Sequence, residues 1–171
     1  MKKGVKAHTK RGQLKLSFGM IFSIILIVIF LVFAFYAIKT FLGISDSAKT
    51  AKFVNNLQAD IDRVWKSAQS SQEQEYFLPS KIEYVCFVDF FISEKGEKGH
   101  FYSELKRSYY GSENMVFYPF GSSELGSREL KNIDLIEITL DENPFCIQNT
   151  NGKAKLTLVK EFDDALVTIT R

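Results

Sequence analysis

Two cysteines and two histidines are the residues of this 171-residue chain whose side chains most readily do chemistry. Cys86 and Cys146 lie far from each other and from His100 in the sequence, so they lack the clustered spacing of a metal site. Cys86 also lies in an apolar run, which disfavours the thiolate that a nucleophile needs. The membrane segment described below leads us to expect both cysteines outside the cell, where an even pair favours a disulfide. The alternative is two separately buried thiols. We therefore predict a bridge between Cys86 and Cys146.

Paired carboxylates occur at Asp141-Glu142 and at Asp163-Asp164. Such pairs bind Ca²⁺ or act as general acid and base in some proteins, but they more often mark solvated turns, which is the interpretation we favour. The sequence holds no glycine-rich phosphate loop, no G-x-S-x-G elbow and no H-E-x-x-H motif. We accordingly expect no enzyme activity, no catalytic residue, no metal and no cofactor.

Aromatic side chains are concentrated between residues 102 and 120. Such rings beside carboxylates stack on sugar or peptide ligands, and tyrosine is favoured at interfaces. The candidate ligand-contact residues are Tyr109, Tyr110 and Tyr118. The alternative is that most of these rings belong to the core of a small domain.

A membrane segment governs where these residues lie. Residues 16–38 contain no charged side chain, and as a helix they would be roughly 34 Å long, enough to cross a bilayer. Residues 1–15 carry six Lys/Arg and no acid, which predicts a basic cytoplasmic tail and places residues 39–171 outside a single-pass cell membrane protein. The tail is too short to build a nucleic-acid reader, so we expect the lipid bilayer and no nucleic acid as its partner.

Residues 39–71 are predicted to form an amphipathic stalk helix that ends near residue 70 or 71. Apolar residues recur there at spacings of three and four, as they do along one helix face; they are Val54, Leu57, Ile61, Val64 and Ala68. This apolar stripe could pack on the chain's own distal domain or on the stripe of a second copy. Because it spans fewer than three clean heptads, we favour the first.

Residues 72–171 show the short alternating runs and turn signals of β-structure. The expected strands cover residues 81–90, 115–118, 133–140, 145–150, 153–160 and 166–170. Asn151-Gly152 is the pair favoured in a type I′ hairpin turn. Together with the helix, these strands predict an α+β protein with a small antiparallel β-rich extracytoplasmic domain.

The segment Lys10-Arg11-Gly12-Gln13-Leu14, followed directly by a long apolar helix, resembles the class III signal of archaeal type IV pilins and archaellins. The resemblance implies that a membrane peptidase cuts between Gly12 and Gln13. It also implies a helix that packs into a filament core while the β-rich head faces outward. The segments around Cys86 and Asn143-Pro-Phe-Cys146 are similar to uncharacterised single-span proteins of small-genome archaea.

Two departures from the pilin pattern favour a permanent anchor over a filament subunit. Ser17 stands where the family has an acidic residue, and Lys15 would be a charge inside a dry helical core. We therefore expect a non-catalytic, pilin-like, membrane-anchored cell-envelope protein that contacts lipid and itself or other pilin-like subunits. The alternative is a membrane-tethered receptor or adhesin that binds a sugar or peptide through its Tyr/Phe residues.

Overall fold

The computed structural model describes residues 18–171, which fall into two compact units. One unit ends at Phe41, and the other runs from Leu42 to Arg171. The basic tail and the candidate cleavage site at Gly12 and Gln13 lie outside the described residues.

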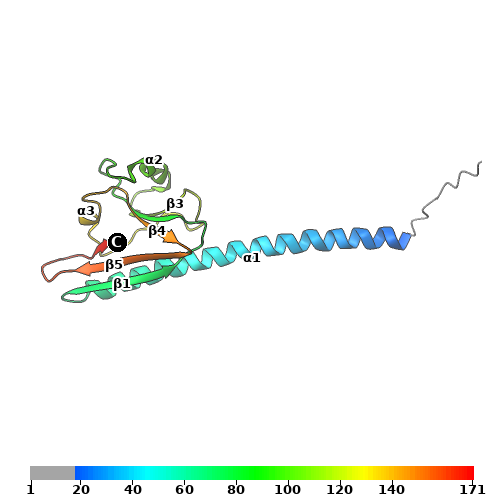
Figure 1. The fold of residues 1–171 in the computed structure, drawn as a ribbon, viewed down its shortest axis with the longest axis horizontal. Helices are drawn as coiled ribbons and strands as arrows, with labels where there is room; N and C mark the ends of the chain where they lie inside the picture. Colours follow the sequence, from blue (N-terminus) through cyan, green and yellow to red (C-terminus); the bar gives the residue numbers. More distant parts are fainter. Residues whose placement is uncertain (1–17) are drawn as a thin grey trace, which may run out of the picture. The chain divides into compact units, whose positions relative to one another are not determined.

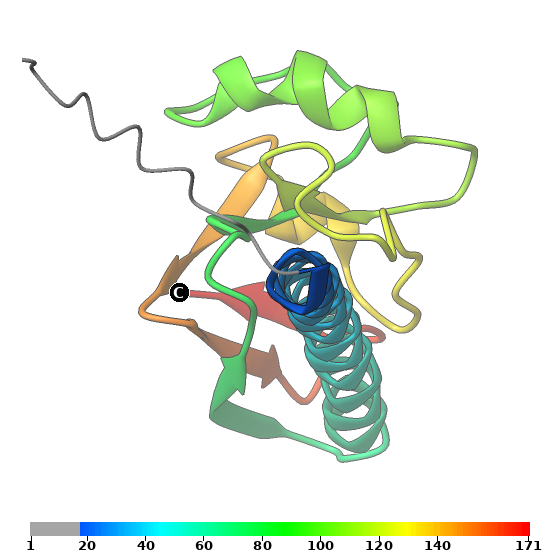
Figure 2. The ribbon, with the colours of Figure 1, turned by 90° about the vertical axis from the view of Figure 1, so that its right-hand side faces the viewer.

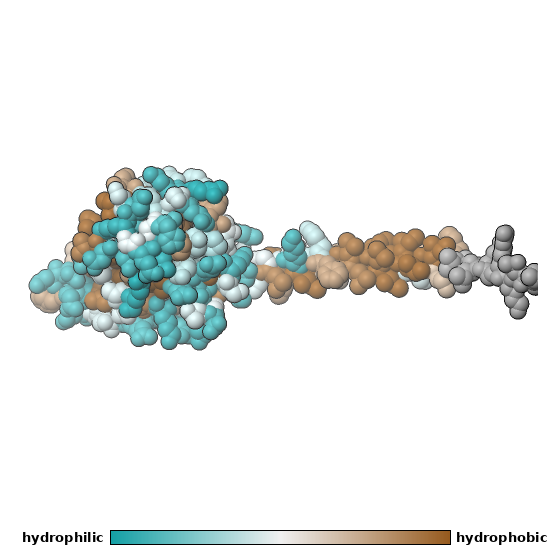
Figure 3. All heavy atoms as spheres, turned by 45° about the horizontal axis from the view of Figure 1, so that its top comes forward, coloured by the Kyte–Doolittle hydropathy of each residue, from teal (hydrophilic) through white to brown (hydrophobic). Residues whose placement is uncertain are grey.

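Helix α1 runs without interruption from Phe18 to Trp65 (Figure 1). Among residues 18–171, it is the one helix long and apolar enough to cross a membrane, and none of its most apolar 18 residues is buried. Figure 3 shows hydrophobic side chains gathered along this stretch. A helix that is apolar all round needs an apolar environment, either a protein core or a membrane.

The second unit is built on one antiparallel sheet of six strands (Figures 1 and 2). Five strands follow the order β1-β5-β4-β2-β3, and β6 pairs with β5. Their bounds are β1 Ser70–Phe77, β2 Tyr84–Phe87, β3 Met115–Tyr118, β4 Phe145–Thr150, β5 Lys153–Lys160 and β6 Thr168–Thr170. The coarse prediction of an α+β protein with a small antiparallel sheet is therefore confirmed.

Short helical segments complete this unit. The 3-10 turn η1 (Gly99–Phe101), helix α2 (Tyr102–Leu105) and the 3-10 turn η2 (Lys106–Ser108) follow one another. Figure 2 shows them on the opposite side of β2, β3 and β4 from α1. Helix α3 (Leu135–Ile138) comes later in the chain. Strands β2–β4 are therefore covered on both faces.

The C-terminal part of α1 packs its apolar stripe against the sheet. Three residues of the stripe, Leu57, Ile61 and Val64, have no exposed surface, and Phe53 beside them is 2% exposed. They share one hydrophobic core with Leu156 and Leu158 of β5 and with other buried side chains. The prediction that the stripe packs on the chain's own distal domain is confirmed. Ala68 does not extend the stripe, because the helix ends at Trp65.

The predicted hairpin turn is also confirmed. Asn151 and Gly152 have φ angles of 55° and 79°, as both central residues of a type I′ turn require. They connect Thr150 and Lys153, which face each other in the ladder between β4 and β5. A Cβ on residue 152 would lie 3.3 Å from the carbonyl oxygen of Leu78, so glycine suits this position for space as well as for conformation.

The predicted strand over residues 133–140 is wrong. The side chain of Asp134 accepts a hydrogen bond from the amide of Glu137 (3.0 Å) and caps a helical turn, α3, in place of a strand. N-cap acceptors of this kind favour a helix start over continued extension. Local capping thus overrides the β-propensity of the neighbouring isoleucines.

Element boundaries differ from the predictions in three further places. The stalk helix ends at Trp65, earlier than residue 70, and Ser70 already begins β1, a polar edge strand that was not predicted. The strand expected over residues 81–90 is limited to β2, Tyr84–Phe87. Past β2, the amide of Asp89 donates to the side chain of Asn143 (3.0 Å) in place of a ladder partner. The last expected strand, 166–170, is limited to β6.

Truncating the helix stripe should destabilise the folded unit. Leu57 has no exposed surface, so Leu57→Ala should lower the free energy of unfolding by about 2–5 kcal/mol, because a cavity remains where the side chain was. The measurement is chemical denaturation of the full chain in detergent, followed by circular dichroism. Asn55→Ala, on the exposed side of the same helix, should change it by less than about 0.5 kcal/mol. Equal effects of the two substitutions would contradict the packing described here.

Candidate functional site

Cys86 and Cys146 face each other across neighbouring strands. Cys86 of β2 is in register with Cys146 of β4, their Cα atoms are 4.0 Å apart and their sulfur atoms 2.10 Å apart. Both residues are at most 3% exposed. This placement agrees with the predicted disulfide. The bond ties together two strands that are 60 residues apart in the sequence, which makes its role structural.

An aromatic layer covers the disulfide's face of the sheet; it consists of Tyr84, Phe90, Phe101, Tyr102, Tyr109 and Tyr118. Within it, the rings of Phe101 and Tyr118 stack with centroids 3.8 Å apart and planes 14° apart. The ring of Tyr84 lies 5.4 Å from that of Phe101, and Lys98 places its Nζ 5.2 Å from the Tyr84 centroid. Partial burial raises the pKa of Tyr118, and the carboxylate of Glu104 raises it further. Because its ring stacks on that of Phe101, Tyr118 serves mainly as packing.

The structure does not bring the three candidate ligand-contact tyrosines into one pocket. Tyr109 lies 4.6 Å from the ring of Phe90 and donates its hydroxyl to the carbonyl of Gly111 (2.6 Å). It lines a cavity of about 90 Å³ to which Tyr110 and Tyr118 do not contribute. Tyr110 is 84% exposed. Of the three residues, only Tyr110 thus presents its ring freely to a ligand.

A carboxylate holds the loop that presents Tyr110. One oxygen of Glu113 accepts hydrogen bonds from the amides of Tyr110 (2.8 Å), Gly111 (2.9 Å) and Ser112 (3.2 Å). These bonds, that from Tyr110 first, lower the pKa of the Glu113 carboxyl. The sequence analysis missed this residue, since a single glutamate after Tyr-Gly-Ser carries no motif.

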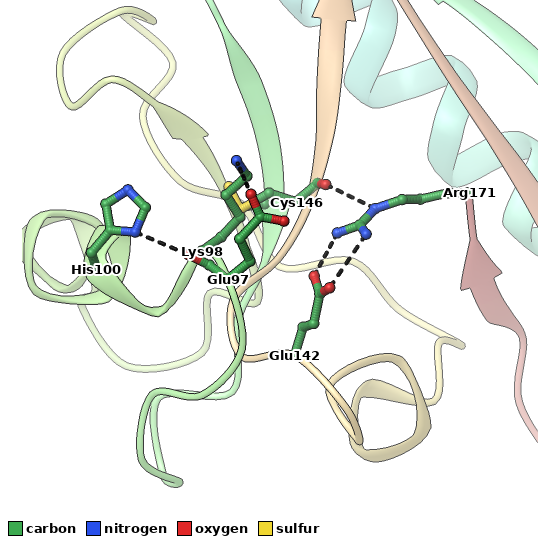
Figure 4. A network of polar contacts seen from close by, with 7 residues as sticks. Glu97, Lys98, His100, Glu142, Cys146 and Arg171 are labelled. Carbon is green, nitrogen blue, oxygen red and sulfur yellow. Dashed lines mark hydrogen bonds and ion pairs between the residues drawn. A yellow bond between two sulfur atoms is a disulfide. The ribbon is translucent and has the colours of Figure 1, made fainter.

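His100 and one member of each carboxylate pair form structural contacts, and Figure 4 shows those of His100 and Glu142. The Nδ1 atom of His100 lies 3.0 Å from the main-chain carbonyl oxygen of Glu97. This contact is therefore with the main chain and not with a carboxylate. Glu142 forms an ion pair with Arg171 at 2.6 Å, and Asp164 accepts from the amide of Glu161 (2.9 Å) in a turn. Within residues 18–171, no group of three His, Cys, Asp or Glu residues is placed to hold a metal ion.

Arg171 joins several groups near the disulfide. Besides its ion pair with Glu142, its Nε donates to the carbonyl oxygen of Cys146 (3.3 Å), and its guanidinium lies 4.6 Å from the centroid of Phe145. Figure 4 shows this side chain reaching from β6 toward β4 and Glu142. Its guanidinium therefore holds the end of the chain after β6 against β4 and against the segment that precedes β4.

The chain matches no protein-family model, no curated protein and no solved structure. The likeness to archaeal type IV pilins therefore rests on Lys10-Arg11-Gly12-Gln13-Leu14 and the apolar helix that follows it. It stays a prediction.

Asn143 is a second residue that the sequence analysis missed. It has no exposed surface. Its side chain accepts from the amide of Asp89 (3.0 Å) and donates to the Asp89 carbonyl (2.9 Å) and the Ser93 carbonyl (3.2 Å). It therefore holds the segment that carries Phe91 near Tyr109. An asparagine before a proline suggests only a turn, so this contact across the fold could not be anticipated.

Removing the disulfide should lower stability without changing the fold. The Cys86→Ala/Cys146→Ala variant should lose about 4 kcal/mol of unfolding free energy in the chain-entropy account of a loop of this length. A reductant should lower the denaturation midpoint of the natural chain and leave that of the variant unchanged. A proteolytic digest without reductant should contain the two cysteine peptides linked. Alkylation of both thiols before reduction would rule the bridge out.

Acid should release the loop around Tyr110. The lowered pKa of Glu113 means that its contribution to stability is present above about 4.5 and is lost as the pH falls through the lower folded value. The amide resonances of residues 110–112 should therefore move together in an NMR titration below pH 4.5. Glu113→Gln should abolish this shared transition, whereas Glu129→Gln, at an exposed position, should leave it in place. Three independent transitions would disprove the shared acceptor.

Proposed function

We propose that the chain is a non-catalytic, membrane-anchored, pilin-like cell-envelope protein that displays its β-rich unit outside the cell. One observation carries the proposal: the N-terminal stretch of α1 exposes large apolar side chains all round, and none of its most apolar 18 residues is buried. Each square ångström of such surface costs about 25 cal/mol in water. A bilayer removes that cost, and a helix satisfies all of its backbone groups there.

The distribution of basic residues supports an orientation with the N-terminus inside. Six Lys/Arg precede the apolar segment, whereas only Lys39, Lys49 and Lys52 follow it closely. Basic residues are retained on the cytoplasmic side. The Cys86–Cys146 bond supports the same orientation, because disulfides persist in oxidising compartments.

The contacts of the polar groups support display over catalysis. His100 is bonded to a main-chain carbonyl, and Glu142 is paired with Arg171. These side chains hold loops and strands in place. A rigid exposed unit on a helix is the arrangement that an envelope protein needs.

A receptor or adhesin is the second candidate, and the exposed rings favour it. Tyr110 and Phe91 are 84% and 86% exposed, and the Glu113 carboxylate fixes the backbone that carries Tyr110. Because the backbone at Tyr110 is already fixed, little conformational entropy is lost when its ring binds a ligand. Such a ring suits contact with a sugar or peptide. A sugar or peptide that selectively shifts the resonances of these two rings would favour this candidate.

Protease treatment of intact cells tests the proposed topology. Residues beyond Phe41 should be degraded from outside, while the protein should resist extraction from membranes by alkaline carbonate. Full protection of residues 42–171 would overturn the proposed orientation, and release by carbonate would overturn the anchoring. Opening the cells before treatment provides the control for protease access.

N-terminal sequencing of protein from native membranes distinguishes an anchor from a filament subunit. We propose that the protein remains mostly an anchored monomer or small oligomer, so that its basic residues are retained. A start at Gln13, together with sheared fibres that contain the protein, would replace the anchor by a filament subunit. A start at Met1 or Lys2 would exclude the filament.

A further inference from the structure

Three aromatic residues and two acidic residues line a small cavity between the segment that follows β2 and the loop that precedes β3. The aromatic residues are Phe90, Phe91 and Tyr109, and the acidic residues are Asp89 and Glu113. The cavity has a volume of about 90 Å³, and its other lining residues are uncharged. It therefore combines negative charge with aromatic surface.

The negative charge of this cavity is not neutralised within the described chain. Neither Asp89 nor Glu113 forms an ion pair with any of residues 18–171. Oδ1 of Asp89 accepts from the amide of Phe91 (2.9 Å), and Oε2 of Glu113 accepts from three amides of the Tyr110 loop. Those amides keep the pKa of Glu113 low, so this carboxyl is ionised at neutral pH. A cation is therefore the complementary ligand.

The rings favour the same class of ligand. Phe91 is 86% exposed, and its ring centroid lies 6.3 Å from that of Tyr109 with the two planes 86° apart. The face of an aromatic ring is negative and attracts a cation that lies within about 6 Å of the centroid. Ring faces and carboxylates thus attract one kind of group, and the alkyl chain that carries such a group packs on the same rings.

The size of the cavity limits which cation fits. Pockets that enclose a whole small molecule measure about 300–1,000 Å³, whereas this cavity has room for about three water molecules at roughly 30 Å³ each. Only the end group of a ligand enters it. Within residues 18–171, no three His, Cys, Asp or Glu side chains are placed to hold a metal ion.

The hydrogen-bonding pattern favours a primary ammonium over a guanidinium. Amides already occupy one oxygen of Asp89 and one of Glu113, which disfavours the two parallel bonds of an arginine pair. A primary ammonium is compact and has three donors that point in different directions. It can donate to the remaining oxygen of each carboxylate.

The walls of the cavity are held in place by contacts outside it. The side chain of Asn143 accepts from the amide of Asp89 (3.0 Å) and donates to its carbonyl (2.9 Å). Glu113 fixes the backbone of residues 110–112 on the other side. Because both walls are already ordered, a ligand loses little binding energy in ordering them.

We propose that this cavity binds a primary ammonium group, which the lysine side chain of a protein or a free amine supplies. Asp89 and Glu113 accept its hydrogen bonds, and Phe91 and Tyr109 contact its charged end and alkyl chain. The site goes beyond the proposed function and does not depend on membrane anchoring, since all of its residues belong to the unit that begins at Leu42. It gives that unit a contact for a basic partner.

The test is an NMR titration of the full chain in micelles of a neutral maltoside detergent. The probe ligand is the peptide acetyl-Ala-Ala-Lys-Ala-Ala-amide, and the matched control is the same peptide with its lysine acetylated and therefore uncharged. The methyl resonances of Leu135, which lines the cavity, should shift saturably with the first peptide. They should not shift with the second.

Substitutions assign the shift to the cavity. Asp89→Asn should weaken binding about tenfold or more, because it removes a charged hydrogen-bond acceptor. Phe91→Leu should weaken it about two- to fivefold, because it removes a ring face. The matched controls are Asp141→Asn and Phe162→Leu, at exposed positions outside the cavity, and both should bind as the natural chain does.

Each outcome decides the proposal. An absent or unsaturable shift, an equal shift with the acetylated peptide, unchanged binding by Asp89→Asn, or an equal loss in the control variants would overturn it. Titration with n-butylammonium distinguishes the sources: weaker binding than the peptide assigns the site to a protein lysine, and equal or tighter binding assigns it to a free amine. The methyl spectrum verifies that each variant is folded. If Asp89→Asn does not fold, Phe91→Leu and the acetylated peptide decide.

Discussion

The burial of one helical stripe is the interaction on which the rest of the second unit depends. Phe53, Leu57, Ile61 and Val64 share a core with residues of β5 and β6, and the sheet has no other helix of comparable length among the described residues to cover that face. A sheet with one apolar face must bury that face against another element. The C-terminal part of α1 thus covers the core of the second unit, and it continues the apolar segment that precedes it in the same helix.

The features that local chemistry controls could be predicted from the sequence. The stripe follows from the 3.6-residue period, and the hairpin at Asn151-Gly152 follows from the positive φ angles that these residues tolerate. The cysteine pair was predicted from its even count and its expected compartment, and the structure adds that the two residues are directly opposite in neighbouring strands. In these cases, sequence-local preferences and tertiary packing agree.

The features that depend on partners far away in the chain could not be predicted. β1 is polar and becomes a strand because β5 supplies its ladder. Asn143 acts through backbone groups of residues 89 and 93, which lie 54 and 50 positions earlier. A cavity between α1 and β1 is lined by Lys49, Glu75 and Phe77, among others, and these residues share no sequence motif. The concentration of aromatic residues was visible in the sequence. Which of them pack, as Tyr118 does, and which are exposed, as Tyr110 is, depends on neighbouring rings that the sequence does not place.

The pairing of β1 with β5 has a consequence for how the protein is made. β1 directly follows the helix, yet its partner is synthesised only after β2, β3 and β4. During synthesis, the stripe of α1 and the edge of β1 are therefore made long before Leu156 and Leu158, which pack against the stripe. The growing chain must therefore pass through a stage in which the helix is complete while the sheet is still open, with the apolar stripe and the unpaired edge of β1 both waiting for β5.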